Sequence, residues 1–538
     1  MTGRPHVEHR PYWLAGASTI VAAAFAIRIL HLFCTERMNP LAPFLQLDAA
    51  TYDRWARALA FGGDPGPTTL MQAPLYPWFL AAIYKIFGPL PATARALQAL
   101  LGTATAALIM YTTRRVFSSA AAALVAGALA ALYAPLIFFE GLILPATLIV
   151  FLNALALALF AGDRRPGTER TLAGGTVLGA AIAANPPNVL LLPFVLLHLG
   201  LAGRGDDIQW PGVPTAPAGS SRPAGAPRPA PARGRMGFLR CALLLLAGVA
   251  LALAPFTIRN YIRSGEFIPL TTGGGVNFYI GNNPGANGYY AAPSYGGSSL
   301  GFAPEEQWRR MTEIAREKSG AALGESDVSR FWFRAGLRWA RAHPLEWTAL
   351  AWQKFIFFWN RYERANVENF YFHRRFPGVL SLPLLTFGVV APLGLLGIFL
   401  ARGRSRRLWL LYGGALVYLA TAVVFYVTAR YRLPVLPFLV PLAAAAVVEL
   451  VGIARRRRFA ELALLAAALA VLALLSNFTV ARDTPQGISA NLVRLGDAYL
   501  SRGDTTRAGA AYLEALALDA ESARAKERLL RVAPCRDD

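Results

Sequence analysis

The sequence predicts an all-α protein, a bundle of about eleven membrane-spanning helices with large loops on one side. Hydrophobic residues fill 55% of the 538 positions and charged residues only 16%, whereas a soluble chain carries roughly 25% charged residues. The apolar residues also form blocks of about 18 to 22 residues, long enough to cross a hydrocarbon core roughly 30 Å thick. In lipid such blocks must satisfy their own backbone hydrogen bonds, so we expect helices.

The clearest apolar blocks are Leu14–Phe33, Thr93–Thr113, Ala120–Ile137, Leu142–Ala161 and Phe238–Ile258. Two further spans are expected at Leu172–Ala184 and Val189–Ala202, separated by a break at Pro186 and Pro187. No small-residue cleavage signature follows the first block, which is long for a signal sequence. We therefore expect that block to be an uncleaved first span.

The distribution of positive charge predicts the orientation. Lys and Arg outnumber Asp and Glu by 53 to 31, an excess that would indicate nucleic acid in a soluble protein. Here the positive residues cluster in short loops between apolar blocks, as at Arg114 and Arg115, which is typical of cytoplasmic loops. The sequence therefore predicts a multi-pass protein of a cell (inner) membrane with a cytoplasmic N-terminus, a C-terminal tail outside, and no nucleic-acid partner.

One apolar segment, Pro74–Phe87, is only about 14 residues long, which suits a helix lying at the interface better than a span. If it crossed the membrane, Arg114 and Arg115 would face outward, and every later basic loop would be inverted. We therefore place it on the outer surface.

The spans divide the chain into an N-terminal membrane module (1–202) with an outer loop (34–92), a Pro- and Arg-rich linker (203–236), a C-terminal membrane module (237–480) with a large outer loop (259–378), and a polar tail (481–538). The composition of the linker predicts a disordered cytoplasmic connection.

The tail has a spacing typical of a tetratricopeptide helix pair. Leu492, Gly496, Ala508 and Tyr512 fall at the expected large and small positions, whereas Ala520 stands where proline is usual. A single repeat cannot bury a core alone, so we expect it to pack on the outer loop or on a partner protein. An ordinary amphipathic hairpin is the alternative.

The first outer loop carries the first candidates for chemistry, Asp48, Tyr52 and Asp53. A carboxylate placed just after a span can take a proton from an acceptor hydroxyl at the outer face. The alternative for Asp48 is a helix N-cap. Asp48 and Asp53 are also able to ligate a divalent cation, although nothing in the sequence requires a cofactor.

Charges in or beside apolar blocks form two more clusters. Arg28 lies within the first span and Glu140 between two spans, and such groups tend to face a cavity or a partner, although Arg28 can also reach the interface. Arg430 and Arg432 flank Tyr431 at the expected outer end of a span. A guanidinium matches phosphate oxygens in shape and charge, so this pair predicts a phosphate site or, less specifically, contact with lipid headgroups.

A fourth cluster begins at Arg259 and Asn260 and continues through three glycines to Asn277 and Asn282. Consecutive glycines let a ligand approach the backbone, and asparagine amides bond sugar hydroxyls. It lacks the Lys and Ser or Thr of a phosphate-binding P-loop. A plain turn cluster has the same composition.

Taken together and in order, these clusters resemble the GT-C class of membrane glycosyltransferases. The nearest resemblance is to the bacterial branch of glycosyltransferase family 39, akin to protein O-mannosyltransferases and the aminoarabinose transferases of lipid A. The matching stretches are Leu47–Ala56, Gln72–Pro77, Phe139–Pro145, Arg259–Asn283, His343–Lys354, Trp359–Glu363 and Arg430–Pro434.

The resemblance implies a sugar donor, a hexose or pentose, carried on polyprenyl phosphate among the membrane lipids, and a protein, lipid or glycan acceptor. It implies that Asp48 is the catalytic base and that basic residues near the outer face meet the donor phosphate. We expect Arg430, Arg432 and Arg28 in that role, with Glu140 and Glu363 supporting the site.

Two departures limit the resemblance. Many relatives carry Arg-Pro where this chain has Pro186 and Pro187, and protein mannosyltransferases carry paired acids where it has Asp48 and Ala49. Close functional identity with the protein mannosyltransferases is therefore not expected.

Two other classes of protein share some of these features. A lipid or sugar transporter or flippase would show internal repeats and interrupted helices at mid-membrane, but the sequence has no clear internal duplication. A non-catalytic scaffold that displays the tail would not need Asp48, Glu140 and Arg430 on one face. The order of the motifs favours the transferase.

Overall fold

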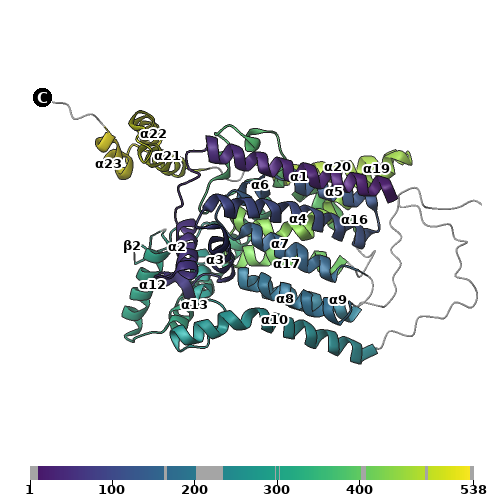
Figure 1. Cartoon of the computed structure of the whole chain (residues 1–538), viewed down its shortest axis with the longest axis horizontal. Helices are drawn as coiled ribbons and strands as arrows, with labels where there is room; N and C mark the ends of the chain where they lie inside the picture. The colour runs from purple at the N-terminus through teal and green to yellow at the C-terminus, as the bar shows by residue number, and fades with distance from the viewer. Residues whose placement is uncertain are drawn as a thin grey trace, which may run out of the picture.

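The computed structural model describes residues 10–162, 166–201, 234–296, 298–301, 303–401, 408–478 and 483–532. Nearly all of these residues are helical, apart from loops and a small antiparallel ribbon of β1 (Ser294–Tyr295) and β2 (Ser298–Ser299). Long helices lie side by side, and shorter helices including α2, α3, α12 and α13 gather at one end of them, here called the loop end (Figure 1). The predicted all-α membrane bundle is confirmed.

The helices of the bundle are α1 (Arg10–Met38), α4 (Pro91–Phe117), α5 (Ala120–Ala131), α6 (Ala134–Glu140), α7 (Ala146–Phe160), α8 (Thr168–Ala184), η2 (Pro186–Leu191), α9 (Leu192–Leu201), α10 (Gly234–Ser264), α16 (Phe387–Ala401), α17 (Trp409–Val424), α19 (Leu436–Arg455) and α20 (Phe459–Asn477). Within the described ranges, five helices are long and apolar enough to cross a membrane, and shorter apolar helices accompany them. The count of about eleven spans stays a prediction.

The loop end and its surroundings comprise α2 (Asp48–Phe61), η1 (Pro67–Leu70), α3 (Leu75–Phe87), α11 (Gly273–Gly281), α12 (Pro304–Ser319), α13 (Glu325–Ala342), α14 (Pro344–Trp359), α15 (Phe370–His373), η3 (Val379–Ser381), α18 (Ala429–Arg432) and η5 (Leu433–Val435). The short apolar segment predicted to stay on the surface forms α3, which packs against α2. An ion pair between Arg54 and Glu305 joins α2 to α12.

Two predicted helix boundaries are corrected. The block Ala120–Ile137 breaks at Leu132 and Tyr133, because the chain around Leu385 exchanges backbone hydrogen bonds with it there. The block Leu142–Ala161 becomes helical only at Ala146, after the bend at Gly141–Pro145. α10 stays helical to Ser264, and the start of the large outer loop at 259 stays a prediction. Hydropathy does not detect tertiary backbone partners.

The linker predicted over 203–236 lies outside the described residues as far as 233, and α10 begins at Gly234. The basic turn predicted at Arg402 to Arg407 also lies outside them.

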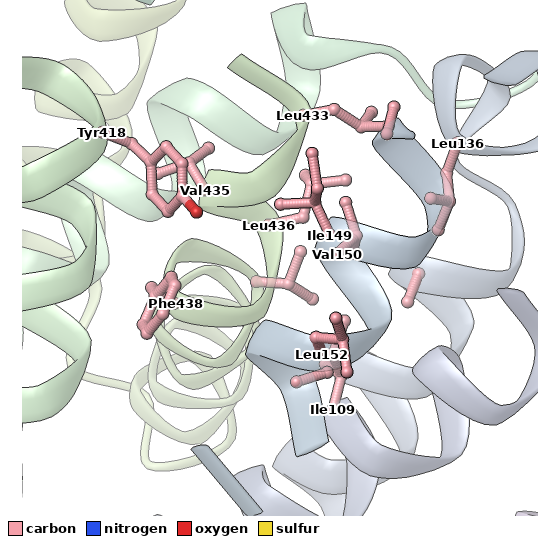
Figure 2. Close-up of a cluster of buried hydrophobic side chains, with 14 of the residues drawn as sticks. Ile109, Leu136, Ile149, Val150, Leu152, Tyr418, Leu433, Val435, Leu436 and Phe438 are labelled. Atoms are coloured by element: carbon pink, nitrogen blue, oxygen red, sulfur yellow. The ribbon is translucent and has the colours of Figure 1, made fainter. Parts of the chain in front are cut away.

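The two membrane modules share one core. Ile109, Leu136 and Ile149 of α4, α6 and α7 belong to the same buried cluster as Leu436 and Phe438 of α19, and all five are at least 95% buried. Leu436 lies beside Ile149 of α7, and Phe438 lies on the side of Tyr418 (Figure 2). Close packing of this kind holds helices together in lipid, where water does not drive them to associate.

A polar contact lies within this apolar core. Asn153 on α7 donates to Tyr418 on α17 at 2.5 Å, and Asn188 of η2 donates to Asn153 at 3.1 Å. Interhelical hydrogen bonds of this kind contribute to association because an unpaired polar group in hydrocarbon is costly. The contact joins the N-terminal module to the C-terminal one.

The tail forms α21 (Pro485–Leu500), α22 (Thr505–Leu518) and α23 (Ala523–Val532). It packs on the loops before α2 and around α15, because Leu492 shares an apolar cluster with Leu41 and Phe372. Of the two expected partners of the tail, a loop of this chain or another protein, the structure shows the first. Arg494 also forms a largely buried ion pair with Glu368. The tetratricopeptide assignment and a protein partner for the tail stay predictions.

Close packing of α16 on α19 depends on Gly397. A Cβ atom there would lie 2.1 Å from the backbone oxygen of Leu442. We expect Gly397→Ala to lower the free energy of unfolding by about 1–3 kcal/mol through overpacking. Thermal unfolding in detergent measures the loss.

Gly274→Ala is the matched control, because a Cβ atom at Gly274 meets nothing within 4 Å. Equal melting temperatures for the two variants would contradict the close approach of α16 and α19.

Candidate active site

The candidate site centres on the contact between Asp48 and Arg430. Asp48 opens α2, directly after Leu47, whose φ of 48° is rare for a residue with a side chain. The Nη1 atom of Arg430 donates to Oδ2 of Asp48 at 2.6 Å. Their side chains are 6% and 17% exposed. The two residues predicted as base and phosphate ligand are therefore brought together.

Tyrosine hydroxyls surround this pair. Arg430 donates from Nη2 to the Tyr431 hydroxyl at 2.6 Å. Tyr52, one turn after Asp48 on α2, and Tyr290 are also close, and burial, assisted by the charge of Asp48, raises the pKa of both hydroxyls. At neutral pH they are uncharged groups, so the ion pair holds the charges of this site.

Tyr290 was not predicted from the sequence. It forms a hydrogen bond with Gln307 of α12, and its ring packs edge-on against that of Tyr426, with 5.5 Å between the ring centroids. No local motif marks Tyr290, because its relation to Asp48 is created by tertiary folding alone. Tyr426 in turn donates to Asn277 at 2.7 Å, which connects the predicted Asn277 to the tyrosines of the site.

The glycine- and asparagine-rich stretch is a helix, α11, and not the loop that was expected. Its amides bond the protein itself: Asn282 donates to the carbonyl oxygens of Phe278 and Val424. Asn260, in α10, donates in the same way to Ile268 and Leu270. Because both asparagines are at least 99% buried, neither presents its amide to a sugar in this structure.

Arg432 belongs to a different buried cluster. Its terminal nitrogens donate to the carbonyl oxygens of Phe358, Asn360 and Tyr362 and form an ion pair with Glu363 at 2.7 Å. Both charged side chains are at most 2% exposed. Arg432 therefore joins α18 to the end of α14, and its terminal donors are occupied within the fold.

Arg28 and Glu140 form a third buried pair, between α1 and α6. The contact is 2.8 Å, and both side chains are at most 1% exposed. Gly102 of α4 makes room for it, since a Cβ atom there would lie 1.9 Å from a Glu140 oxygen. The predicted phosphate ligand Arg28 is thus paired inside the bundle and does not contact Asp48 or Arg430 through any of its hydrogen bonds or ion pairs.

Asp53 connects α2 to α3, and Arg259 connects α10 to α2 and η1. Asp53 accepts from Arg57 at 2.7 Å and from the Tyr84 hydroxyl at 2.6 Å. The Arg259 guanidinium lies 5.1 Å from the centre of the Trp55 ring and donates to the backbone oxygen of Thr69.

The described residues hold no cluster of three or more His, Cys, Asp or Glu side chains placed to bind a metal ion. Asp48 pairs with Arg430, whereas Asp53 pairs with Arg57. This arrangement does not bring the two acids to a shared cation.

A cavity lies beside the first turn of α2. Its lining includes Ala49, which follows Asp48, together with Arg95, His31, His373 and Leu142. Asp48 itself does not line the cavity, so the space reaches the neighbourhood of the base but not its carboxylate. Asn39 donates from Nδ2 to Nδ1 of His373 at 3.0 Å.

Lys354 on α14 supports the site from a distance. It is 1% exposed and donates to the Gly281 carbonyl oxygen at 2.8 Å, at the end of α11. Burial lowers the pKa of Lys354 to about 7. This lysine holds the helix that carries Asn277, the partner of Tyr426.

Comparisons with known proteins agree with the resemblance to the GT-C class of membrane glycosyltransferases. A family model described as dolichyl-phosphate-mannose-protein mannosyltransferase matches residues 71–207. The match covers α3 to α9 and confirms the resemblance to membrane glycosyltransferases. Asp48 and Arg430 lie outside the matched residues, so their roles depend on the geometry. No curated protein matches the sequence.

Solved structures similar to this chain include the oligosaccharyltransferase AglB of Archaeoglobus fulgidus, in complex with an inhibitory peptide and a dolichol-phosphate (TM-score 0.46, 15% identity, 97% of this chain and 56% of that chain). Another is ArnT from Cupriavidus metallidurans bound to undecaprenyl phosphate (TM-score 0.35, 15% identity, 82% of this chain and 79% of that chain). This chain thus spans little more than half the length of the archaeal protein.

The buried pair of Arg432 and Glu363 predicts a stability effect. Arg432→Ala or Glu363→Ala leaves one charge buried and unpaired, which costs about 3–5 kcal/mol. Replacing both partners by apolar residues, Arg432→Met with Glu363→Leu, is expected to restore only part of that loss, because three backbone carbonyl oxygens lose the donor that Arg432 supplied. Thermal unfolding in detergent compares the three variants. A double variant as unstable as either alanine variant would contradict this assignment.

The pKa of Lys354 predicts a pH dependence. In the unfolded chain a lysine keeps a pKa of about 10.4, so between pH 7 and pH 10 the unfolded state binds more protons. The free energy of unfolding therefore rises with pH in this window. Wild type should gain stability relative to Lys354→Met from pH 7 to pH 10, measured by chemical unfolding. Parallel pH curves for the two proteins would contradict it.

Proposed function

We propose that the chain is a glycosyltransferase that moves a sugar from a polyprenyl-phosphate carrier to an acceptor hydroxyl. The contact between Asp48 and Arg430 carries this proposal, because it brings the carboxylate that we propose as general base next to the guanidinium that we propose as phosphate ligand. The match of residues 71–207 to a family named for a dolichyl-phosphate sugar donor supports the same class of donor.

The reaction is a single displacement. Asp48 takes the proton from the acceptor hydroxyl, whose oxygen attacks the anomeric carbon of the sugar. The bond between that carbon and the phosphate oxygen breaks, and the electron pair leaves with the lipid phosphate. Arg430 stabilises the negative charge that develops on the departing phosphate.

The surroundings of the pair suit this chemistry. Arg430 is 5% exposed, and an ionic interaction shielded from water is stronger than one at the surface. Tyr52 and Tyr431 offer hydroxyls to sugar or phosphate oxygens next to the pair.

The orientation follows from the basic loops. Arg114 and Arg115 end α4, and cytoplasmic loops are the ones enriched in such residues. α4 begins close to α3, so the loop end lies on the other side. We therefore place the site and the C-terminal tail on the outer face of a cell (inner) membrane.

Asp48→Asn is the direct test of this function. It keeps the shape of the side chain but removes the base, so we expect transfer to fall by about 10²–10⁴-fold. The assay uses purified protein and a panel of radiolabelled lipid-phosphate sugars. Asp64→Asn, an exposed acid of the same outer loop, is the control and should keep its activity. Full transfer by Asp48→Asn would overturn the proposed function.

A further inference from the structure

We propose that the Asp48–Arg430 ion pair is a lock that the phosphate of the lipid carrier opens. The phosphate takes Arg430 from Asp48 and so frees the carboxylate to act as the base. This inference rests on the function proposed above and adds an order to it, in which the donor binds before the base becomes competent.

The first observation is that the base is occupied in the structure. Arg430 Nη1 lies 2.6 Å from Asp48 Oδ2. That oxygen already accepts a hydrogen bond from a charged donor, so it does not meet an acceptor hydroxyl while the pair is intact. Release from Arg430 frees this oxygen to accept the proton of an acceptor hydroxyl.

The second observation is that Arg430 has unused binding capacity. Its Nε atom is buried and has no hydrogen-bond partner in the structure, although Nη1 and Nη2 both donate. Buried N–H groups are normally paired. Arg430 is 5% exposed. The Nε atoms of Arg28 and Arg95 are also buried without a hydrogen-bond partner, so this atom does not by itself identify a ligand, but it leaves one donor of the Arg430 guanidinium free for a phosphate oxygen.

The charge of that acceptor follows from the neighbours. Tyr52, Tyr290 and Tyr431 supply hydroxyls around the guanidinium, and burial raises the pKa of Tyr52 and Tyr290. Neutral hydroxyls cannot replace a carboxylate as the partner of a buried cation. The phosphate of a lipid-linked sugar is a diester with one negative charge and two non-bridging acceptor oxygens, so it can pair with Arg430 while Asp48 leaves.

The two partners also differ in freedom to move. The Asp48 side chain is 17% exposed, whereas that of Arg430 is 6% exposed and lies 4.7 Å from the centre of the Tyr431 ring. Exchange therefore moves the carboxylate and keeps the guanidinium in place. In this way the buried cation is paired both before and after the donor binds.

The lock has a consequence for catalysis. Without a donor, Asp48 stays paired and does not activate hydroxyls that enter the site. With a donor, the same phosphate that must later leave is the group that releases the base. Activation of the acceptor is thereby coupled to the presence of a sugar to transfer.

The test measures binding of undecaprenyl phosphate, a lipid phosphate without a sugar, to detergent-purified protein. Asp48→Asn removes the competing charge, so we expect its affinity to rise about tenfold or more, as the loss of a close charge pair implies. Arg430→Gln should bind about tenfold more weakly or worse. In the double variant the gain from Asp48→Asn should disappear, because the two residues act on one group.

Asp64→Asn is the charge-matched control, and its affinity should equal that of wild type. Stability gives a second readout that does not need turnover: undecaprenyl phosphate should raise the melting temperature of Asp48→Asn more than that of wild type. This comparison still applies if the substitution weakens the fold.

Equal or weaker binding by Asp48→Asn would overturn the lock, while the proposed function would stand if the same variant had lost transfer. Retained transfer by Asp48→Asn would overturn the function itself. Inorganic phosphate serves as a further arm. A gain seen for inorganic phosphate but not for the lipid phosphate would show a general anion site and would also overturn the proposal.

Discussion

The ion pair between Asp48 and Arg430 joins two segments that are 382 residues apart. It forms only if α2 and α18 meet at the same end of the bundle. Burial of Arg430 makes this a demanding arrangement, since a buried cation must be paired. The packing of the two membrane modules around Ile149 and Leu436 supplies the frame that brings these segments together (Figure 2).

The other buried charges have a different use. Arg28 with Glu140 and Arg432 with Glu363 are closed pairs at most 2% exposed, and they connect neighbouring elements. In the pair of Asp48 and Arg430, the carboxylate side chain is 17% exposed.

The architecture could be predicted from the sequence because it depends on local properties. Apolar blocks and basic loops predicted the helical bundle and the surface position of α3, and the order of motifs predicted Asp48 and Arg430 as site residues. Tertiary contacts could not be predicted in this way. The amides of Asn260 and Asn282 bond backbone carbonyls, Arg432 is enclosed by the end of α14, and Tyr290 reaches the site only through folding. Composition does not distinguish an amide that meets a ligand from one that meets the protein.

A structure of the protein with undecaprenyl phosphate bound, solved in a lipid nanodisc, tests directly whether the phosphate replaces Asp48 as the partner of Arg430. We expect phosphate oxygens within hydrogen-bonding distance of the Arg430 guanidinium and the Asp48 carboxylate turned away from it. A phosphate bound at another basic group, with the pair of Asp48 and Arg430 intact, would contradict it.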